Sequence, residues 1–195
     1  MRTAVIERET KETKVFVSLN LDGSGTYSNK TGVGFFDHML DVCLKQTPFD
    51  VEIKAEGDLQ VDAHHTVEDV GIALGKALAE ALGDCRGINR YGFFILPMDE
   101  ALVMTSIDIS GRGYLAYDVP LQAQKVGDFD TELSLEFFTA LARCANLTLH
   151  IKELAGVNTH HILEGVFKSF GRALAMAVAI DPAKKDVIPS TKGVL

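Results

Sequence analysis

Two short stretches of the sequence carry the same three chemical groups at the same spacing. Each reads His-His-x-x-Glu, and each stands at the start of an apolar helical pattern. The six residues are His64, His65, Glu68, His160, His161 and Glu164. Imidazole nitrogens and carboxylate oxygens bind divalent transition metals, and chance does not readily produce the same set twice, so the stretches predict a metal site.

The geometry of an α-helix decides which of these side chains can bind the same ion. Successive residues turn by about 100°, so Glu68 lies about 40° from His64 and about 60° from His65. His64 and Glu68 can share one ion, whereas His65 points too far round the helix and is placed for a second ion. If the two stretches face each other, in one chain or across a subunit contact, each ion receives imidazoles from both helices and a carboxylate from one.

Two histidines lie outside the repeated stretches. His38 opens a predicted helix at a position that Phe137 occupies in the second half, and His150 lies in a predicted strand where the first half has Glu52. Either one alone could be an ordinary core or surface histidine. With the six repeated residues, however, they complete two sets of three nitrogens and one oxygen. Such sets leave positions open on a six-coordinate ion and fit manganese or iron as well as zinc.

The elements that must position these groups come from an internal duplication. An offset of 96 residues superposes nine identical residues within the eighteen positions from His64 to Ala81, and the match continues upstream at an offset of 98. Each copy contains alternating apolar patterns typical of strands and longer patterns of helical period. We therefore predict the α+β class: an internally duplicated two-layer α/β sandwich, in which each of two similar halves has a sheet with helices on one face.

The repeat also predicts the boundaries of the two halves. Residues 1–88 form the first α+β repeat, residues 89–181 form the second, and residues 182–195 form a polar tail interrupted by Pro182 and Pro189. No linker rich in Ser or Pro separates the repeats, so we expect the two halves to share a core.

The composition argues against several classes of protein. A formal net charge of −8 disfavours binding to nucleic acid, and no apolar run approaches the ~20 residues that cross a bilayer. The segment "MRTAVIERETKETKVF" carries charges where a signal peptide has an apolar core, so we expect a cytoplasmic protein with neither nucleic-acid nor membrane partners. Cys43, Cys85 and Cys144 lie far apart in apolar patterns and are expected to be reduced and packed.

Further segments along the chain carry a resemblance to a known family. Together with the two histidine stretches, "RETKET", "GFFDHMLD", "NRYG", "SGRGY" and "PSTKGVL" closely resemble the imidazoleglycerol-phosphate dehydratases over essentially the whole chain. The resemblance, to the monofunctional form, implies dehydration of imidazole glycerol phosphate to imidazole acetol phosphate in histidine biosynthesis, with two manganese ions per active site. It also implies a fold similar to the second domain of ribosomal protein S5, and a homo-oligomer of 24 subunits built from trimers, with active sites between subunits.

The resemblance assigns roles to individual residues. The metal ligands that it implies are His38, His64, His65, Glu68, His150, His160, His161 and Glu164, the set already counted from the residues alone. Glu12 in "RETKET" takes the part of the catalytic carboxylate and contacts the substrate. The phosphate is bound by Arg90, Arg112, Ser190 and Lys192, and the tail 182–195 closes over the active site. Without the resemblance, each of these five would more often be an ordinary surface group.

The reaction removes hydroxide and a proton from neighbouring carbons, although no carbonyl acidifies the C–H bond. We expect the imidazole ring of the substrate to take the role of the missing carbonyl. With both ring nitrogens bound to metal, an imidazolate forms and expels the hydroxyl, giving a diazafulvene-like intermediate. Glu12 then removes the proton from the next carbon. The alternatives are a dinuclear metallohydrolase, which would usually have more bridging carboxylates, and a metal-storage shell, which would not need the basic cluster.

Overall fold

The computed structural model describes residues 1–195, and its first half contains one sheet and two helices. The elements are β1 (Thr3–Glu9), β2 (Thr13–Asn20), β3 (Tyr27–Lys30), α1 (Gly34–Leu44), β4 (Asp50–Gly57) and α2 (His64–Leu82). The strand order is β1-β2-β4-β3, in which only β3 and β4 are parallel neighbours. Buried Val15, Val17 and Leu19 alternate with less buried residues along β2, so one face of the sheet packs against the helices.

The second half repeats this arrangement. Its elements are β5 (Tyr91–Met98), β6 (Ala101–Asp108), β7 (Tyr114–Asp118), α3 (Leu133–Cys144), β10 (Thr148–Ala155) and α4 (Thr159–Val178). The strand order β5-β6-β10-β7 again has one parallel pair, β7 with β10. The predicted duplicated α+β fold is confirmed. The sequence did not predict the short hairpin β8 (Lys125–Val126) and β9 (Phe129–Asp130), which lies between β7 and α3.

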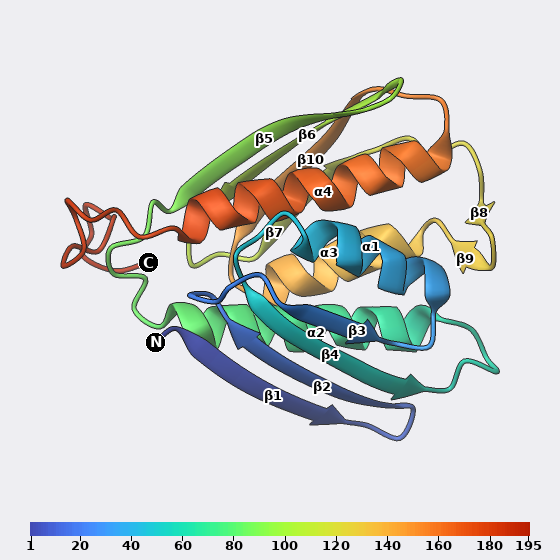
Figure 1. Ribbon diagram of the computed structural model, residues 1–195, viewed down its shortest axis with the longest axis horizontal. Helices are drawn as coiled ribbons and strands as arrows, with labels where there is room; N and C mark the ends of the chain where they lie inside the picture. Colours follow the sequence, from blue (N-terminus) through green and yellow to red (C-terminus); the bar gives the residue numbers. More distant parts are fainter.

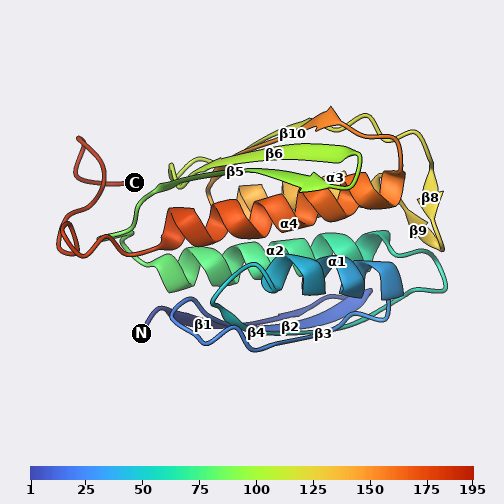
Figure 2. The same ribbon diagram turned by 45° about the horizontal axis from the view of Figure 1, so that its top comes forward.

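The two halves pack helix layer against helix layer, with the sheets outside, as Figures 1 and 2 show. Helix α2 packs against α3, and α4 packs against α1, so each long helix contacts a helix of the other half. Between the layers, the ring of Phe36 lies 5.2 Å from that of Phe137 and 6.5 Å from that of Phe167. A single hydrophobic cluster therefore includes both halves, and the predicted shared core is confirmed.

Two glycines at equivalent positions of the repeat permit these helix contacts. A Cβ atom on Gly75 would lie 2.8 Å from the carbonyl oxygen of Leu141 in α3. A Cβ atom on Gly171 would lie 2.3 Å from the carbonyl oxygen of Cys43 in α1. The identical glycines found by the offset of 96 residues thus mark where the backbones of the helices meet.

The topology brings the starts of α1, α2 and α4 to one end of the molecule, beside β8 and β9 (Figure 1). The C-terminal residues lie at the other end, where α4 finishes, and the amide of Gly87 donates to the carbonyl of Val187 there. Both His-His-x-x-Glu stretches therefore lie at the end opposite the tail. None of the helices is long and apolar enough to cross a membrane.

We expect Gly171→Ala to lower the free energy of unfolding by about 1–3 kcal/mol, the usual cost of overpacking a close contact. This loss outweighs the gain of about 1 kcal/mol that alanine brings to a helix interior. Thermal unfolding followed by circular dichroism measures the change. Gly34→Ala is the control, because a Cβ atom there meets nothing within 4 Å. Equal melting temperatures for the two variants would contradict this account of the α1–α4 contact.

Candidate metal centre and active site

The start of α4 is fixed by the side chain before it. Oδ1 of Asn158 accepts hydrogen bonds from the amides of His160 at 2.9 Å and His161 at 3.3 Å, satisfying two donors that a helix start leaves free. One turn further on, Glu164 returns to the side of the helix that His160 occupies, and His160 Nε2 lies 3.3 Å from Glu164 Oε2. The predicted sharing of one side by the first histidine and the glutamate is confirmed for α4.

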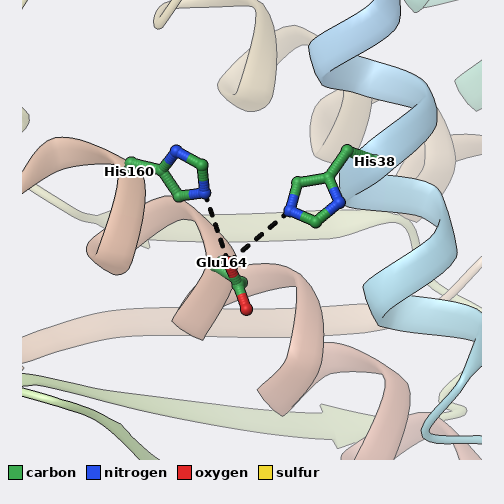
Figure 3. A group of neighbouring side chains, drawn as sticks. All are labelled: His38, His160 and Glu164. Atoms are coloured by element: carbon green, nitrogen blue, oxygen red, sulfur yellow. Dashed lines mark ion pairs between the residues drawn. The ribbon is translucent and has the colours of Figure 1, made fainter.

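Helix α1 adds a third group to this pair. His38 Nε2 lies 3.6 Å from Glu164 Oε2, and the rings of His38 and His160 are 5.7 Å apart. Figure 3 shows the two imidazoles, one from α1 and one from α4, converging on the carboxylate. One ligand atom from each residue lies within 4.8 Å of the others. Two nitrogens and one carboxylate oxygen at this spacing suit a divalent transition metal.

Glu164 carries its charge in a largely buried position, with 8% of its surface exposed. Burial acts to raise the pKa of Glu164, but the hydrogen bond and charge of Lys168, with His38 and His160, together hold that pKa below its ordinary value. Lys168 Nζ contacts Glu164 Oε1 one helical turn further along. The centre therefore presents a carboxylate anion, the form that binds a cation.

His161 points away from this centre. Its Nδ1 lies 2.8 Å from Glu100 Oε2, and its ring lies 6.3 Å from that of His160 at 77°. This hydrogen bond raises the pKa of His161 and, with the amides of Asn158 and Val157, lowers the pKa of Glu100 to about 2. The adjacent histidines of α4 thus face different surroundings.

The first half divides its histidines in the same way. The rings of His64 and His65 lie 6.2 Å apart at 84°. His65 Nδ1 lies 3.0 Å from Asp58 Oδ2, and this hydrogen bond raises the pKa of His65. Glu12 Oε2 lies 3.9 Å from the same nitrogen. Glu12, from the turn between β1 and β2, is therefore brought to one of the histidine stretches.

The chain does not bring the two stretches together. Only His38, His160 and Glu164 form a group of three close enough to hold an ion. His64, His65, Glu68, His150 and His161 lie outside that group. His150, on β10, is exposed beside Tyr114, with the two rings 5.9 Å apart. Of the two arrangements considered, the one in which the stretches face each other within one chain is not seen, because no close group of ligands draws on both stretches.

The basic residues assigned to the phosphate lie elsewhere. The Arg90 side chain donates to Asp108 Oδ1 at 2.7 Å and to the carbonyl of Pro189 in the tail at 2.9 Å. The amide of Lys192 donates to Ser190 Oγ at 3.2 Å, which places these two tail residues together. Arg112 makes a side-chain bond to the carbonyl of Ser110 at 3.2 Å. The structure thus ties Arg90 to the tail, whereas none of these four contacts the histidines.

The long axis of α4 separates the basic residues from the histidines. The amide of Arg90 donates to the carbonyl of Ala177 in the last turn of α4, whereas His160 lies in its first turn. At 1.5 Å per residue, the 20 residues of α4 span about 30 Å. A small substrate cannot contact both Arg90 and His160 in one chain.

The sequence did not point to four residues that support the histidines or Glu164: Asp58, Glu100, Asn158 and Lys168. For Asn158 a signal existed, because Asp62 stands at the equivalent position of the repeat and its Oδ1 accepts from the amide of His64 at 2.7 Å. Asp58 and Glu100 reach their histidines from preceding loops, where the sequence pattern carries no such signal.

The fold and the site define a class of protein: a duplicated α+β protein that gathers histidines and carboxylates at the starts of its repeated helices. The family model described as imidazoleglycerol-phosphate dehydratase matches residues 31–174. The chain belongs to the imidazoleglycerol-phosphate dehydratase family. It is a hydro-lyase of histidine biosynthesis that acts on imidazoleglycerol phosphate.

Relatives and solved structures agree over the length of the chain. The imidazoleglycerol-phosphate dehydratases of Dinoroseobacter shibae and Ruegeria sp. (strain TM1040) are 59% and 58% identical over 195 residues, covering 100% of both chains in each case. The enzyme from Staphylococcus aureus has a TM-score of 0.84 at 40% identity, covering 92% of this chain and 99% of that one. The enzyme from Pyrococcus furiosus, in complex with (S)-C348, has the same values over 97% and 100%.

We expect Asn158→Ala to destabilise the protein by about 1 kcal/mol, because two amides at the start of α4 lose their acceptor. For a chain of this size, that loss lowers the melting temperature by roughly 2–4 °C. Differential scanning calorimetry measures it. Asn158→Ser keeps a capping oxygen without adding charge beside Glu100 and should melt close to the parent protein. An equal fall in both variants would show that capping is not the cause.

Proposed function

We propose that this hydro-lyase depends on two divalent metal ions per active site, that both are manganese, and that each active site forms between subunits. The observation that carries the proposal is the cluster of His38, His160 and Glu164 at the start of α4. A buried anionic carboxylate with two imidazoles beside it fits a divalent ion, whereas a purely structural role for these groups leaves the repeated pattern unexplained.

The ligands that one chain does not supply to each ion can be assigned to a neighbouring subunit. His38, His160 and Glu164 supply two nitrogens and one oxygen, so one further nitrogen completes the set of three nitrogens and one oxygen. In the other stretch, His64 shares a side of α2 with Glu68, which leaves His65 to complete the first set from a neighbouring subunit. The second ion is then held by His64 and Glu68 with the two remaining histidines of the neighbour. These are His150 and His161.

The separation of the basic residues supports the same arrangement. Within one chain, Arg90 contacts Ala177, which lies 17 residues after His160 in α4, or about 26 Å along the helix. A neighbouring subunit must therefore bring one group to the other. A homo-oligomer meets this requirement, and we propose the shell of 24 subunits built from trimers, working in the cytoplasm. The division of the chain into 1–88, 89–181 and a closing tail 182–195 belongs to the same proposal.

When bound, the two metal ions supply Lewis acidity that lowers the pKa of the ring N–H group of the substrate. The chain's own groups do the rest. Arg90, Arg112 and Lys192 hold the phosphate by charge and Ser190 by its hydroxyl, so that the substrate has one orientation. Glu12 takes the proton from the carbon next to the one that loses hydroxide. Its carboxylate suits this role, because it is well exposed and lies 3.9 Å from His65 Nδ1.

We expect Glu12→Gln to lower kcat by ~10²-fold or more, because the amide cannot accept the proton. The variant should still bind two metal ions per site and bind substrate with near-normal affinity. Steady-state kinetics, elemental analysis and calorimetric titration measure the three quantities. Full activity in Glu12→Gln would remove this residue from the chemistry.

Mixing two inactive variants tests whether the sites lie between subunits. His65→Ala and His160→Ala should each be inactive alone. Co-expressed in equal amounts, they should regain up to about a quarter of the parent activity, because some contacts pair an intact α2 with an intact α4. The matched control mixes His160→Ala with Glu164→Gln, which damage the same side of the site and should regain nothing. No recovery in the first mixture would place the complete site in one chain.

A further inference from the structure

Beside the proposed ligand Glu68, a buried carboxylate ties α2 to the first two strands. Asp69 is 6% exposed, and both of its oxygens are used. Arg8 in β1 donates to Oδ1 from Nε at 2.9 Å and from Nη2 at 2.8 Å. The hydroxyl of Thr13, the first residue of β2, donates to Oδ2. The carboxylate therefore joins α2 to both sides of the β1–β2 hairpin.

The same hairpin carries Glu12, whose backbone is fixed by short-range bonds. Thr10 Oγ1 accepts from the amides of Glu12 at 3.1 Å and Thr13 at 3.0 Å. The carbonyl of Glu12 accepts from the amide of Asp58 at 3.1 Å. The Glu12 carboxylate itself makes no hydrogen bond within the chain. Its position relative to α2 thus depends on how the turn is attached.

The second half shows that the fold does not need this polar network. Val15 pairs with Ala55 and Val103 pairs with Glu153, which are equivalent at the offset of 98 residues, so Val15 corresponds to Val103. Arg8 lies opposite Val15 and Leu96 lies opposite Val103. Arg8 therefore corresponds to Leu96 and, by the same register, Thr13 corresponds to Ala101.

The offset of 96 residues pairs Asp69 with Gly165. At the equivalent place, Leu96 and Ala101 are buried, with 9% and 1% of their surfaces exposed. A Cβ atom on Gly165 would lie 3.0 Å from the side chain of Val103. Small and apolar residues therefore complete the same packing.

A buried carboxylate must be fully hydrogen-bonded to offset its desolvation. Apolar residues at these positions would therefore stabilise the fold more simply. The polar network of Arg8, Thr13 and Asp69 occurs only in the half that carries Glu12. This asymmetry between two copies of one unit points to a requirement of the site rather than of the fold.

We propose that Asp69 is a positioning residue: through Thr13 and Arg8 it fixes the β1–β2 turn on α2, so that the Glu12 carboxylate is held beside the histidine stretch. The inference rests on the proposed role of Glu12. Displacement of a catalytic group by about 1 Å can cost ~10²-fold in rate, so the attachment of a turn can control turnover.

Thr13→Val removes the hydroxyl with little change of shape. We expect kcat to fall at least ~10-fold, with KM and metal content changed less than about threefold, because the substitution frees the turn that carries Glu12 and touches no proposed metal ligand or phosphate-binding residue. Thr13→Ser keeps the hydroxyl and should restore kcat to within about twofold of the parent enzyme. Equal kcat values for Thr13→Val and the parent enzyme would overturn the proposal, as would failure of Thr13→Ser to restore activity.

The triple variant Arg8→Leu, Thr13→Ala, Asp69→Gly introduces the residues found at the equivalent positions of the second half and leaves no buried charge unpaired. It should fold, assemble and bind metal, yet lose kcat at least as far as Thr13→Val. Circular dichroism, light scattering and elemental analysis check the first three points. Full turnover in the triple variant would overturn the proposal.

Coupling to Glu12 separates this inference from the proposed function. If Thr13 acts through Glu12, adding Thr13→Val to Glu12→Gln lowers kcat by less than about twofold further. A full additional loss would show that Thr13 acts in another way and would overturn the proposal. Full activity in Glu12→Gln alone would instead refute the catalytic role of Glu12, whatever the Thr13 variants do.

Discussion

The turn of about 100° between successive residues of an α-helix is the constraint on which this site depends. It keeps adjacent histidines from facing one point: the rings of His160 and His161 lie 6.3 Å apart at 77°, and those of His64 and His65 lie 6.2 Å apart at 84°. The two histidines of each stretch therefore point in different directions. One chain alone does not supply all the ligands of either proposed ion. The proposed pairs of ions, and their place between subunits, both follow from this division.

The duplicated fold turns that local constraint into a site. Two sheets lie outside and four helices inside, and the helices of one half pack on those of the other at Gly75 and Gly171. This packing brings His38 of the first half to Glu164 of the second. The two copies have also diverged in how the first two strands are attached to the long helix. Asp69 and its partners tie down the turn that carries Glu12, whereas Gly165 stands at the equivalent position of α4.

The sequence predicted what depends on local periodicity. The repeat predicted the α+β halves, and helical spacing predicted that Glu164 can share one side of α4 with His160 while His161 points about 100° away from His160. The approach of His38 to Glu164 needs the crossing of α1 and α4, which no periodicity encodes, so the sequence could offer His38 only as a candidate. Likewise, the contact of His161 with Glu100 comes from a tight turn between two strands.

The hairpin β8–β9 escaped prediction because strands of two residues are too short to show an alternating pattern. The distance between the histidines and Arg90 also could not be read from sequence, since it depends on both being attached to opposite ends of α4. That distance keeps a small molecule from contacting both Arg90 and His160 within one chain. The family, by contrast, was evident from the motifs alone.

Crystals grown with manganese and measured at its absorption edge test the central claim most directly. The account predicts two anomalous peaks per site. One should lie between His38, His160 and Glu164 of one subunit and His65 of the next, and the other should be bound by His64 and Glu68 with two histidines of the neighbour. A single peak, or ions bound entirely by side chains of one subunit, would contradict it.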